Sequence, residues 1–178
     1  MGSLPATSPS LVEAVSQPGV EQDLPMEGST GVLRLNPPQD REFLRVREGR
    51  FHLETLFTRN IPLELTLKTG ASSAEVDLTD LKVTRLRIET GASRFTVHLP
   101  ARAGYTEATV QARAAQITII VPQGVAARIR EDVGLASVRV DTSRFPEAGG
   151  LYESIGFDTA SNRVELHVQG GVANVEVK

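Results

Sequence analysis

The sequence has no cysteine and no tryptophan, and aromatic residues make up only 4% of its 178 residues. The lack of cysteine excludes disulfides, zinc–thiolate centres and a thiol nucleophile, and it is compatible with either side of a membrane. The apolar residues are mainly valine, leucine, isoleucine and alanine. This set of apolar residue types suits narrow, regularly stacked β-layers better than a large mixed core.

The chain also lacks a positive charge excess and a long apolar run. Its net charge of −3 and its pI near 5.7 argue against binding to nucleic acid or acidic membranes. No stretch approaches the roughly 18 apolar residues of a spanning helix, and residues 1–10 have neither the basic start nor the apolar stretch of a signal peptide. We expect no direct membrane insertion, and any anchor of the natural protein to lie outside this sequence.

Residues 1–30 are rich in proline, serine, glutamine and glycine and show no sustained periodicity. This composition predicts a flexible linker, which a truncation would remove without loss of stability. From residue 31 to residue 178, turn signals and alternation predict one β-repeat domain. Its first candidate strands are Val32–Leu35, Phe43–Val46 and Phe51–Phe57.

An internal repeat organises the rest of the chain. The segment Thr69–Leu78, a Thr-Gly-Ala turn followed by an alternating strand, has four further copies. Equivalent positions are Ala74, Phe95, Ile117, Val138 and Val175, and therefore lie 21, 22, 21 and 37 residues apart. The longer last interval places an inserted loop at Thr142–Ser161, which contains Pro146 and Gly149–Gly150.

Each copy is predicted to form a rung of two strands joined by a tight turn. One such hairpin cannot bury its apolar side alone, so the copies must stack. The fold class is then all-β, with stacked β-rungs of about 21 residues, a β-solenoid-like arrangement. Equivalent side chains form two inward ladders, which are Ala74, Phe95, Ile117, Val138, Val175 and Val76, Val97, Ile119, Val140, Val177.

The turn glycines, one inward glutamate and the last rung each lead to a separate structural prediction. Gly70, Gly91, Gly134 and Gly171 are expected at positive φ, which leaves Arg113 in the third copy strained or in a different turn. Glu131 occupies an inward apolar position, which calls for a bulge or an exposed rung edge. The last rung, with Val172–Val177, is expected at the end of the stack.

Two segments resemble the bacterial toast-rack family. One is the run Pro62–Ala71 (PLELTLKTGA) with Val76–Leu86 (VDLTDLKVTRL), and the other is Asn162–Val177 (NRVELHVQGGVANVEV). The resemblance extends from Ile61 to Lys178, about two-thirds of the chain, and rests on glycine turns and alternating aliphatics. It implies a domain like the C-terminal part of LiaF-type cell-wall-active antibiotic response proteins, tethered to a membrane and acting through protein contacts. Such proteins carry membrane helices upstream, and this sequence has none.

Residues able to carry chemistry are present but do not form a recognisable site. His52, His98 and His167 are far apart and lack metal-ligand spacing. Five acids could in principle act as a general acid and base, but their spacing specifies no pair; they are Asp77, Asp80, Glu89, Asp132 and Asp141. Ser72, Ser73 and Ser93 are turn residues without a nucleophile elbow. We therefore expect no enzyme, no catalytic or metal site and no cofactor.

The arginines are interleaved with acids and indicate a solvated surface or, less favoured, a weak basic strip; they are Arg85, Arg87, Arg102, Arg113, Arg128 and Arg130. The function predicted is a non-enzymatic structural or interaction module of the bacterial cell envelope, from a protein related to envelope stress. It would bind a protein partner, or itself, through strand edges and the insertion. The alternatives are a self-assembling, bactofilin-like scaffold and a carbohydrate-binding surface, for which only Tyr105 and Tyr152 supply tyrosine rings.

Overall fold

The computed structural model describes residues 1–8, 10–17, 21–23, 26–27, 30–31, 34–36, 52–70, 73–134, 137–171 and 173–178. The N-terminal strands are β1 (Gly2–Ser3), β2 (Val12–Gln17), β3 (Glu21–Asp23), β4 (Met26–Glu27), β5 (Thr30–Gly31), β6 (Arg34–Asn36) and β7 (His52–Phe57). The stacked strands are β8 (Pro62–Thr69), β9 (Ser73–Asp77), β10 (Lys82–Thr90), β11 (Arg94–His98), β12 (Tyr105–Ala112), β13 (Gln116–Ile120), β14 (Ala126–Val133), β15 (Ser137–Val140), β18 (Arg163–Gly170) and β19 (Asn174–Val177). Between β15 and β18 lie β16 (Glu147–Ala148), β17 (Leu151–Glu153) and the 3-10 helix η2 (Phe157–Thr159).

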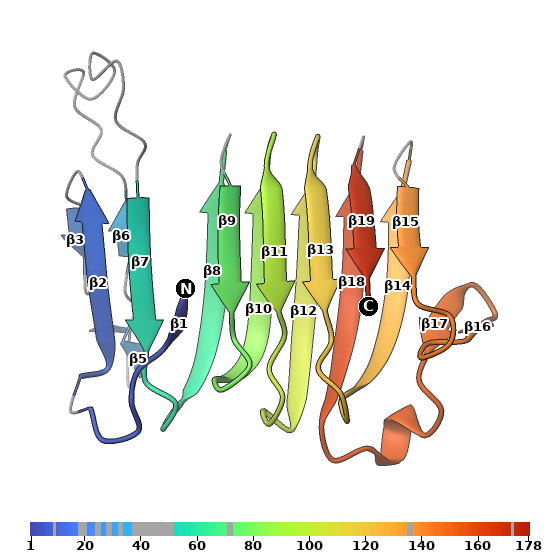
Figure 1. Cartoon of the computed structure of the whole chain (residues 1–178), viewed down its shortest axis with the longest axis horizontal. Coiled ribbons are helices and arrows are strands. Elements are labelled where there is room, and N and C mark those ends of the chain that lie inside the picture. The colour runs from blue at the N-terminus through green and yellow to red at the C-terminus, as the bar shows by residue number, and fades with distance from the viewer. Residues whose placement is uncertain are drawn as a thin grey trace.

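The stacked strands form two facing layers (Figure 1). The longer strand of each rung belongs to a seven-stranded sheet of order β16-β17-β14-β18-β12-β10-β8, and the shorter strand to a five-stranded sheet of order β15-β19-β13-β11-β9. The rung strands pair in parallel within each layer. Apolar side chains from both layers meet in one core, because alternation sends every second side chain inward. The predicted all-β fold of stacked rungs is confirmed.

The register confirms both predicted ladders. Phe95 pairs with Ala74 on one side and Ile117 on the other, and Val97 pairs likewise with Val76 and Ile119. Phe95 is 1% exposed and Val97 is fully buried. Hydrogen-bonded parallel pairing thus places equivalent residues of successive copies side by side, as the repeat requires.

The order of the rungs differs from their order in the sequence. The last rung, β18–β19, lies between β12–β13 and β14–β15, so the fourth copy ends the stack. Val175 and Val177 are 2% and 1% exposed, with β13 on one side and β15 on the other. The expectation that Val172–Val177 ends the stack is therefore wrong. The insertion supplies the chain length to return past β14 before β18 begins.

The glycines of the rung turns do not take the expected conformation. Among described residues, positive φ occurs only at Gly104, Gly124, Gly149, Gly150 and Gly156, which lie in the connections and the insertion. Gly91 serves close approach instead, because a Cβ there would lie 3.3 Å from the Gly70 carbonyl oxygen of the neighbouring rung. Arg113 fits the same turn without strain, since no described non-glycine residue has positive φ.

The N-terminal segment is not a flexible linker where it is described. β2 runs antiparallel to β7 over six residue pairs, and β1 runs parallel to the other side of β7. Leu4 is 1% exposed, and its N–H donates to the Phe57 carbonyl at 2.7 Å. The linker expectation for residues 1–30 is wrong for these strands, because pairing with β7 across the sequence overrides their weak local pattern. Of the three expected strands, Phe51–Phe57 corresponds to β7, Val32–Leu35 overlaps β6, and Phe43–Val46 lies outside the described residues.

Candidate interaction surfaces

The outer face of the seven-stranded sheet carries acidic and basic side chains that pair across neighbouring strands. Arg85 lies 3.1 Å from Glu64 and 3.7 Å from Glu107, one on each neighbouring strand. The Tyr105 hydroxyl donates to Glu165 at 2.9 Å, and burial followed by this hydrogen bond raises the pKa of the phenol. Because the charges alternate across strands, they neutralise one another at contact distance. This face matches the solvated surface predicted from the interleaved arginines.

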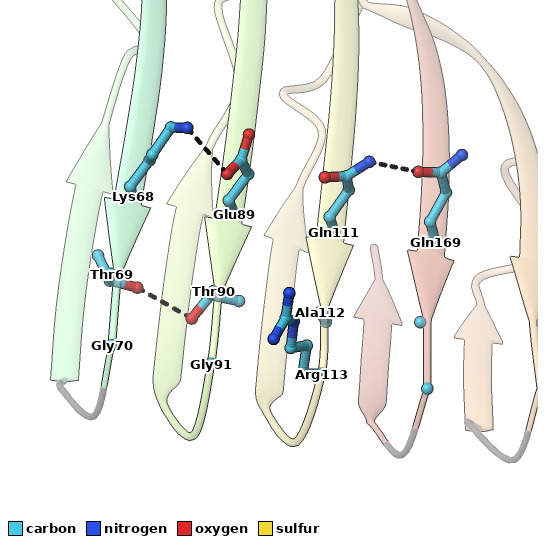
Figure 2. A pocket seen from close by; sticks show the side chains of 12 residues that line it. Lys68, Thr69, Gly70, Glu89, Thr90, Gly91, Gln111, Ala112, Arg113 and Gln169 are labelled. Carbon is cyan, nitrogen blue, oxygen red and sulfur yellow. Dashed lines mark hydrogen bonds and ion pairs between the residues drawn. The ribbon is translucent and has the colours of Figure 1, made fainter.

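A shallow groove of about 570 Å³ crosses the turn end of the rungs β8, β10, β12 and β18 (Figure 2). Its polar side chains pair across neighbouring rungs. Lys68 lies 3.1 Å from Glu89, the Gln111 amide donates to Gln169 at 2.7 Å, and the Thr69 and Thr90 hydroxyls are 2.9 Å apart. These polar side chains satisfy one another, so their contacts fasten neighbouring rungs together.

The five-stranded sheet ends in an edge strand. β15 pairs with β19, and no strand within the described part of the chain lies on its other side. Ser137 and Asp141 donate their N–H groups toward β19. Since backbone groups alternate in direction along a strand, the N–H and C=O groups of Val138 and Val140 point to the free side. This edge can accept the backbone of an added strand.

The seven-stranded sheet, in contrast, extends two strands past β14. β17 pairs antiparallel with β14, and β16 pairs with β17. Arg128 fastens this hairpin by contacting Glu153 and, at 3.0 Å, Asp158, and its guanidinium lies 4.2 Å from the Phe157 ring centroid. Ser154 adds a hydrogen bond from its N–H to the Ala127 carbonyl at 2.8 Å. One layer therefore extends past the other at this end of the stack, and this overhang of β16 and β17 lies to the lower right of β15 in Figure 1.

The overhang, which is formed by β16 and β17 beside β14, presents a tyrosine and two glutamates on the inward face of the sheet. Tyr152 is in register with the fully buried Ile129 and with Glu147, so all three side chains lie on one face of the sheet. Glu131 follows Ile129 by two residues and shares that face. Burial raises the pKa of the Tyr152 phenol, and the nearby Glu131 and Glu147 carboxylates raise it further. Glu131 pairs in register with Val168 and is exposed, which confirms a rung edge rather than a bulge.

The residues considered for catalysis or metal binding are not gathered in one place. His98 lies on the five-stranded sheet and His167 on the seven-stranded sheet. Asp77 and Asp141 each close a turn, accepting N–H bonds from Thr79 at 2.9 Å and Ser143 at 3.1 Å. Hydrogen bonds from Thr79 and Ser143 hold the pKa values of these two carboxyls below the usual range. Within the described ranges, no three histidine or acidic side chains are placed to hold a metal ion.

The remaining candidates have structural partners or lie apart. Asp80 is 3.6 Å from Arg59, and Glu89 contacts Arg87 and Lys68. Asp132 is exposed on β14, Ser93 contacts the Thr90 hydroxyl, and Ser72 lies outside the described residues. Tyr105 points outward and Tyr152 inward, so they do not form one aromatic platform. Among the described residues, no helix is long and apolar enough to cross a membrane.

Sequence reasoning missed Glu147, named Tyr152 only as a ring for a carbohydrate surface, and treated Glu131 as an irregularity. A signal was present in the fourth copy, which carries Glu131 where the fifth copy has Val168. A polar residue at an inward ladder position is typical of an outermost rung. The fully apolar fifth copy is correspondingly typical of an interior rung.

The fold is that of a stacked-rung β-domain whose five-stranded layer has one edge paired with Met1 and the other edge, β15, open among the described strands. The chain belongs to the family described as the N-terminal domain of toast_rack, DUF2154, whose model matches residues 13–120. The match begins within β2, so it includes part of the segment expected to be a linker.

One solved structure is similar over nearly the whole chain. It is described as that of a "putative cell adhesion protein" from Clostridium sporogenes ATCC 15579, with a TM-score of 0.80, 15% sequence identity, and coverage of 99% of this chain and 86% of that chain. At this identity the likeness establishes the fold alone. No curated protein sequence matches the chain.

Proposed function

We propose that this domain is a non-enzymatic interaction module of the bacterial cell envelope, and that it binds an extended segment of a partner protein by strand addition at β15. The observation that carries the proposal is the unequal ending of the two layers. The seven-stranded sheet is extended past β14 by a fastened hairpin, while β15 offers the backbone groups of Val138 and Val140 beside it. Added strands obtain affinity from such backbone groups and specificity from the side-chain positions beside them.

The proposal of a role in the cell envelope rests on similarity to other proteins. The chain belongs to the toast_rack family, and its fold is similar to that of a protein described as a cell adhesion protein. Both findings favour a surface or envelope role. Within that setting we propose a protein related to envelope stress, like the LiaF-type regulators. The test is to delete the gene and measure survival and envelope-stress reporter output with cell-wall antibiotics. An unchanged response to those antibiotics would contradict the stress role and leave adhesion to be tested by surface attachment.

Strand addition is tested with a displayed library of extended peptides. Binders recovered on the intact chain are retested on two variants of one position. Val140→Pro removes an N–H that points to the free side and not toward β19, so the rung pairing is kept. Val140→Ala makes the side chain smaller but keeps that N–H, and it is the matched control.

We expect binders that are lost with Val140→Pro and retained with Val140→Ala, with circular dichroism confirming that both variants keep their β content. Failure to recover binders, or binders equally insensitive to both variants, would contradict strand addition at β15. Light scattering of the free chain checks the scaffold alternative, because end-to-end stacking predicts growing particles at raised concentration.

A further inference from the structure

The open end of the stack breaks the apolar pattern of the core at one position. Glu131 occupies the ladder place held in the other rungs by Leu67, Ile88, Val110 and Val168. A carboxylate facing the interlayer space is tolerated here because the rung is outermost and Glu131 remains exposed. A strand added to β15 would reduce that exposure, so Glu131 must influence which strands are accepted.

A second carboxylate lies on the same face of the overhang. Glu147 is the register partner of Tyr152, and both glutamates are close enough to Tyr152 to raise the pKa of its phenol. Tyr152 on the overhang and Val138 and Val140 on β15 are partly buried against the core. Both layers are therefore partly apolar at this end of the stack. The overhang therefore combines an apolar ring with negative charge on two of its neighbours.

The placement of these groups sets what an added strand must present. Its alternate side chains face inward at intervals of about 6.8 Å and would lie over the overhang. An apolar side chain there covers Tyr152, but carboxylates that lose water without gaining a partner are costly. A lysine or arginine can lay its stem on the tyrosine ring and place its charge on a glutamate.

We propose that the β15 edge selects an extended peptide segment that presents basic residues next to an apolar one at its inward positions. This inference rests on the proposed function, since it assumes strand addition at β15, and it adds the chemistry of the partner. The charged pair Glu131 and Glu147 then determines specificity, while the backbone groups of Val138 and Val140 supply the general affinity.

The described edge strands β15 and β2 of a second copy of this chain do not meet that requirement. The inward residues of β15 are Val138 and Val140, and those of β2, at the other end of the molecule, are Val12, Ala14 and Ser16. Neither edge brings a cation to Glu131 or Glu147, and two β15 edges would bring like charges together. The occupant is therefore a segment of another protein.

The experiment uses two synthetic capped peptides as probes. Both alternate threonine on one face with three residues on the other, which are lysine, valine, lysine in the first and glutamate, valine, glutamate in the second. Binding to the intact chain is followed by amide chemical shifts in NMR titrations at low and high salt. The protein variants are Glu131→Gln with Glu147→Gln, and Asp132→Asn, which removes one charge from the outer face beside Glu131.

We expect the lysine peptide to shift the β15 amides and to bind at least about fivefold more tightly than the glutamate peptide. High salt and the double variant should remove that preference, and Asp132→Asn should retain it. Equal binding of the two peptides at β15 would overturn the charge selection and leave strand addition intact. If neither peptide binds at β15 and the displayed library also yields no binders, both proposals fail.

Glu131 and Glu147 have one alternative explanation, in which their inward charge serves only to prevent edge-to-edge association of the chain with itself. In that case the double variant would self-associate while its affinity for the lysine peptide stayed at the wild-type value. Sedimentation of the double variant in the same buffer measures this, and that pair of results would overturn the inference.

Discussion

The two ends of the stack are finished differently. At the N-terminal end, the Met1 carbonyl accepts the Asp77 N–H at 2.9 Å, and β1, β7 and β2 continue the layer beyond β9. At the other end, β15 has β19 on one side and no described strand on the other. In the same layer, therefore, one edge is occupied by the chain itself and the other is available. This difference within one layer is the reason for proposing that a partner strand binds at β15.

The covered end should therefore contribute much more stability than its sequence indicates. Removal of residues 1–17 deletes β1 and β2, loses the buried Leu4 side chain and uncovers β7 and the β9 edge. We expect the free energy of unfolding to fall by at least about 3–5 kcal/mol in urea titration. The control is Val15→Thr, since Val15 is 66% exposed and should change stability by less than about 0.5 kcal/mol. An unchanged midpoint after the truncation would mean that these strands do not hold the edge.

Single truncations at the two ends should differ in the same direction. Leu4→Ala removes a fully buried side chain and should lower the free energy of unfolding by about 2–5 kcal/mol. Val140→Ala removes methyl groups from a half-buried position on β15 and should lower it by only about 1 kcal/mol. Equal losses by urea titration would contradict the contrast between a closed and an open end.

A smaller effect concerns acid stability at the two end rungs. Asp77 and Asp141 close equivalent turns, and hydrogen bonds from Thr79 and Ser143 lower their carboxyl pKa values from 3.8. A carboxyl with a lowered folded-state pKa stabilises the fold at pH values above its unfolded pKa, and this contribution disappears as the pH falls through the folded pKa. We expect stability to decline below about pH 4, and Asp77→Asn or Asp141→Asn to flatten that decline in thermal melts. A wild-type decline in both variants would exclude these turns as its source.

The repeat predicted the register well because each rung repeats one local pattern. Ala74, Phe95 and Ile117 fall into one ladder for the same reason that they recur at near-constant spacing. The order of the rungs was not predictable from spacing, since an insertion allows the chain to return to either side of β14. β2 was missed because its pairing with β7 depends on residues about forty positions away.

The candidate site was only partly predictable. Glu131 stood out in the sequence as a polar residue in an apolar ladder, but its meaning required knowing that the fourth copy is outermost. Tyr152 and Glu147 lie in the insertion, where no repeat fixes their orientation, and only the pairing of β17 with β14 brings them to Glu131. The turn glycines were misjudged because none of them takes positive φ. Close stacking accounts for Gly91, whereas a Cβ at Gly70 or Gly134 would meet nothing within 4 Å.

Amide hydrogen exchange of the free chain tests the central claim most directly. The Asp77 and Val140 amides point outward from the two end rungs of the same layer, and only the Asp77 amide has a described acceptor. We expect the Asp77 amide to exchange on the order of 100-fold more slowly than the Val138 and Val140 amides. The Arg139 amide, which points toward β19, should be slower than both of its neighbours. Equal protection of Asp77, Val138 and Val140 in a monomeric sample would contradict an open edge at β15.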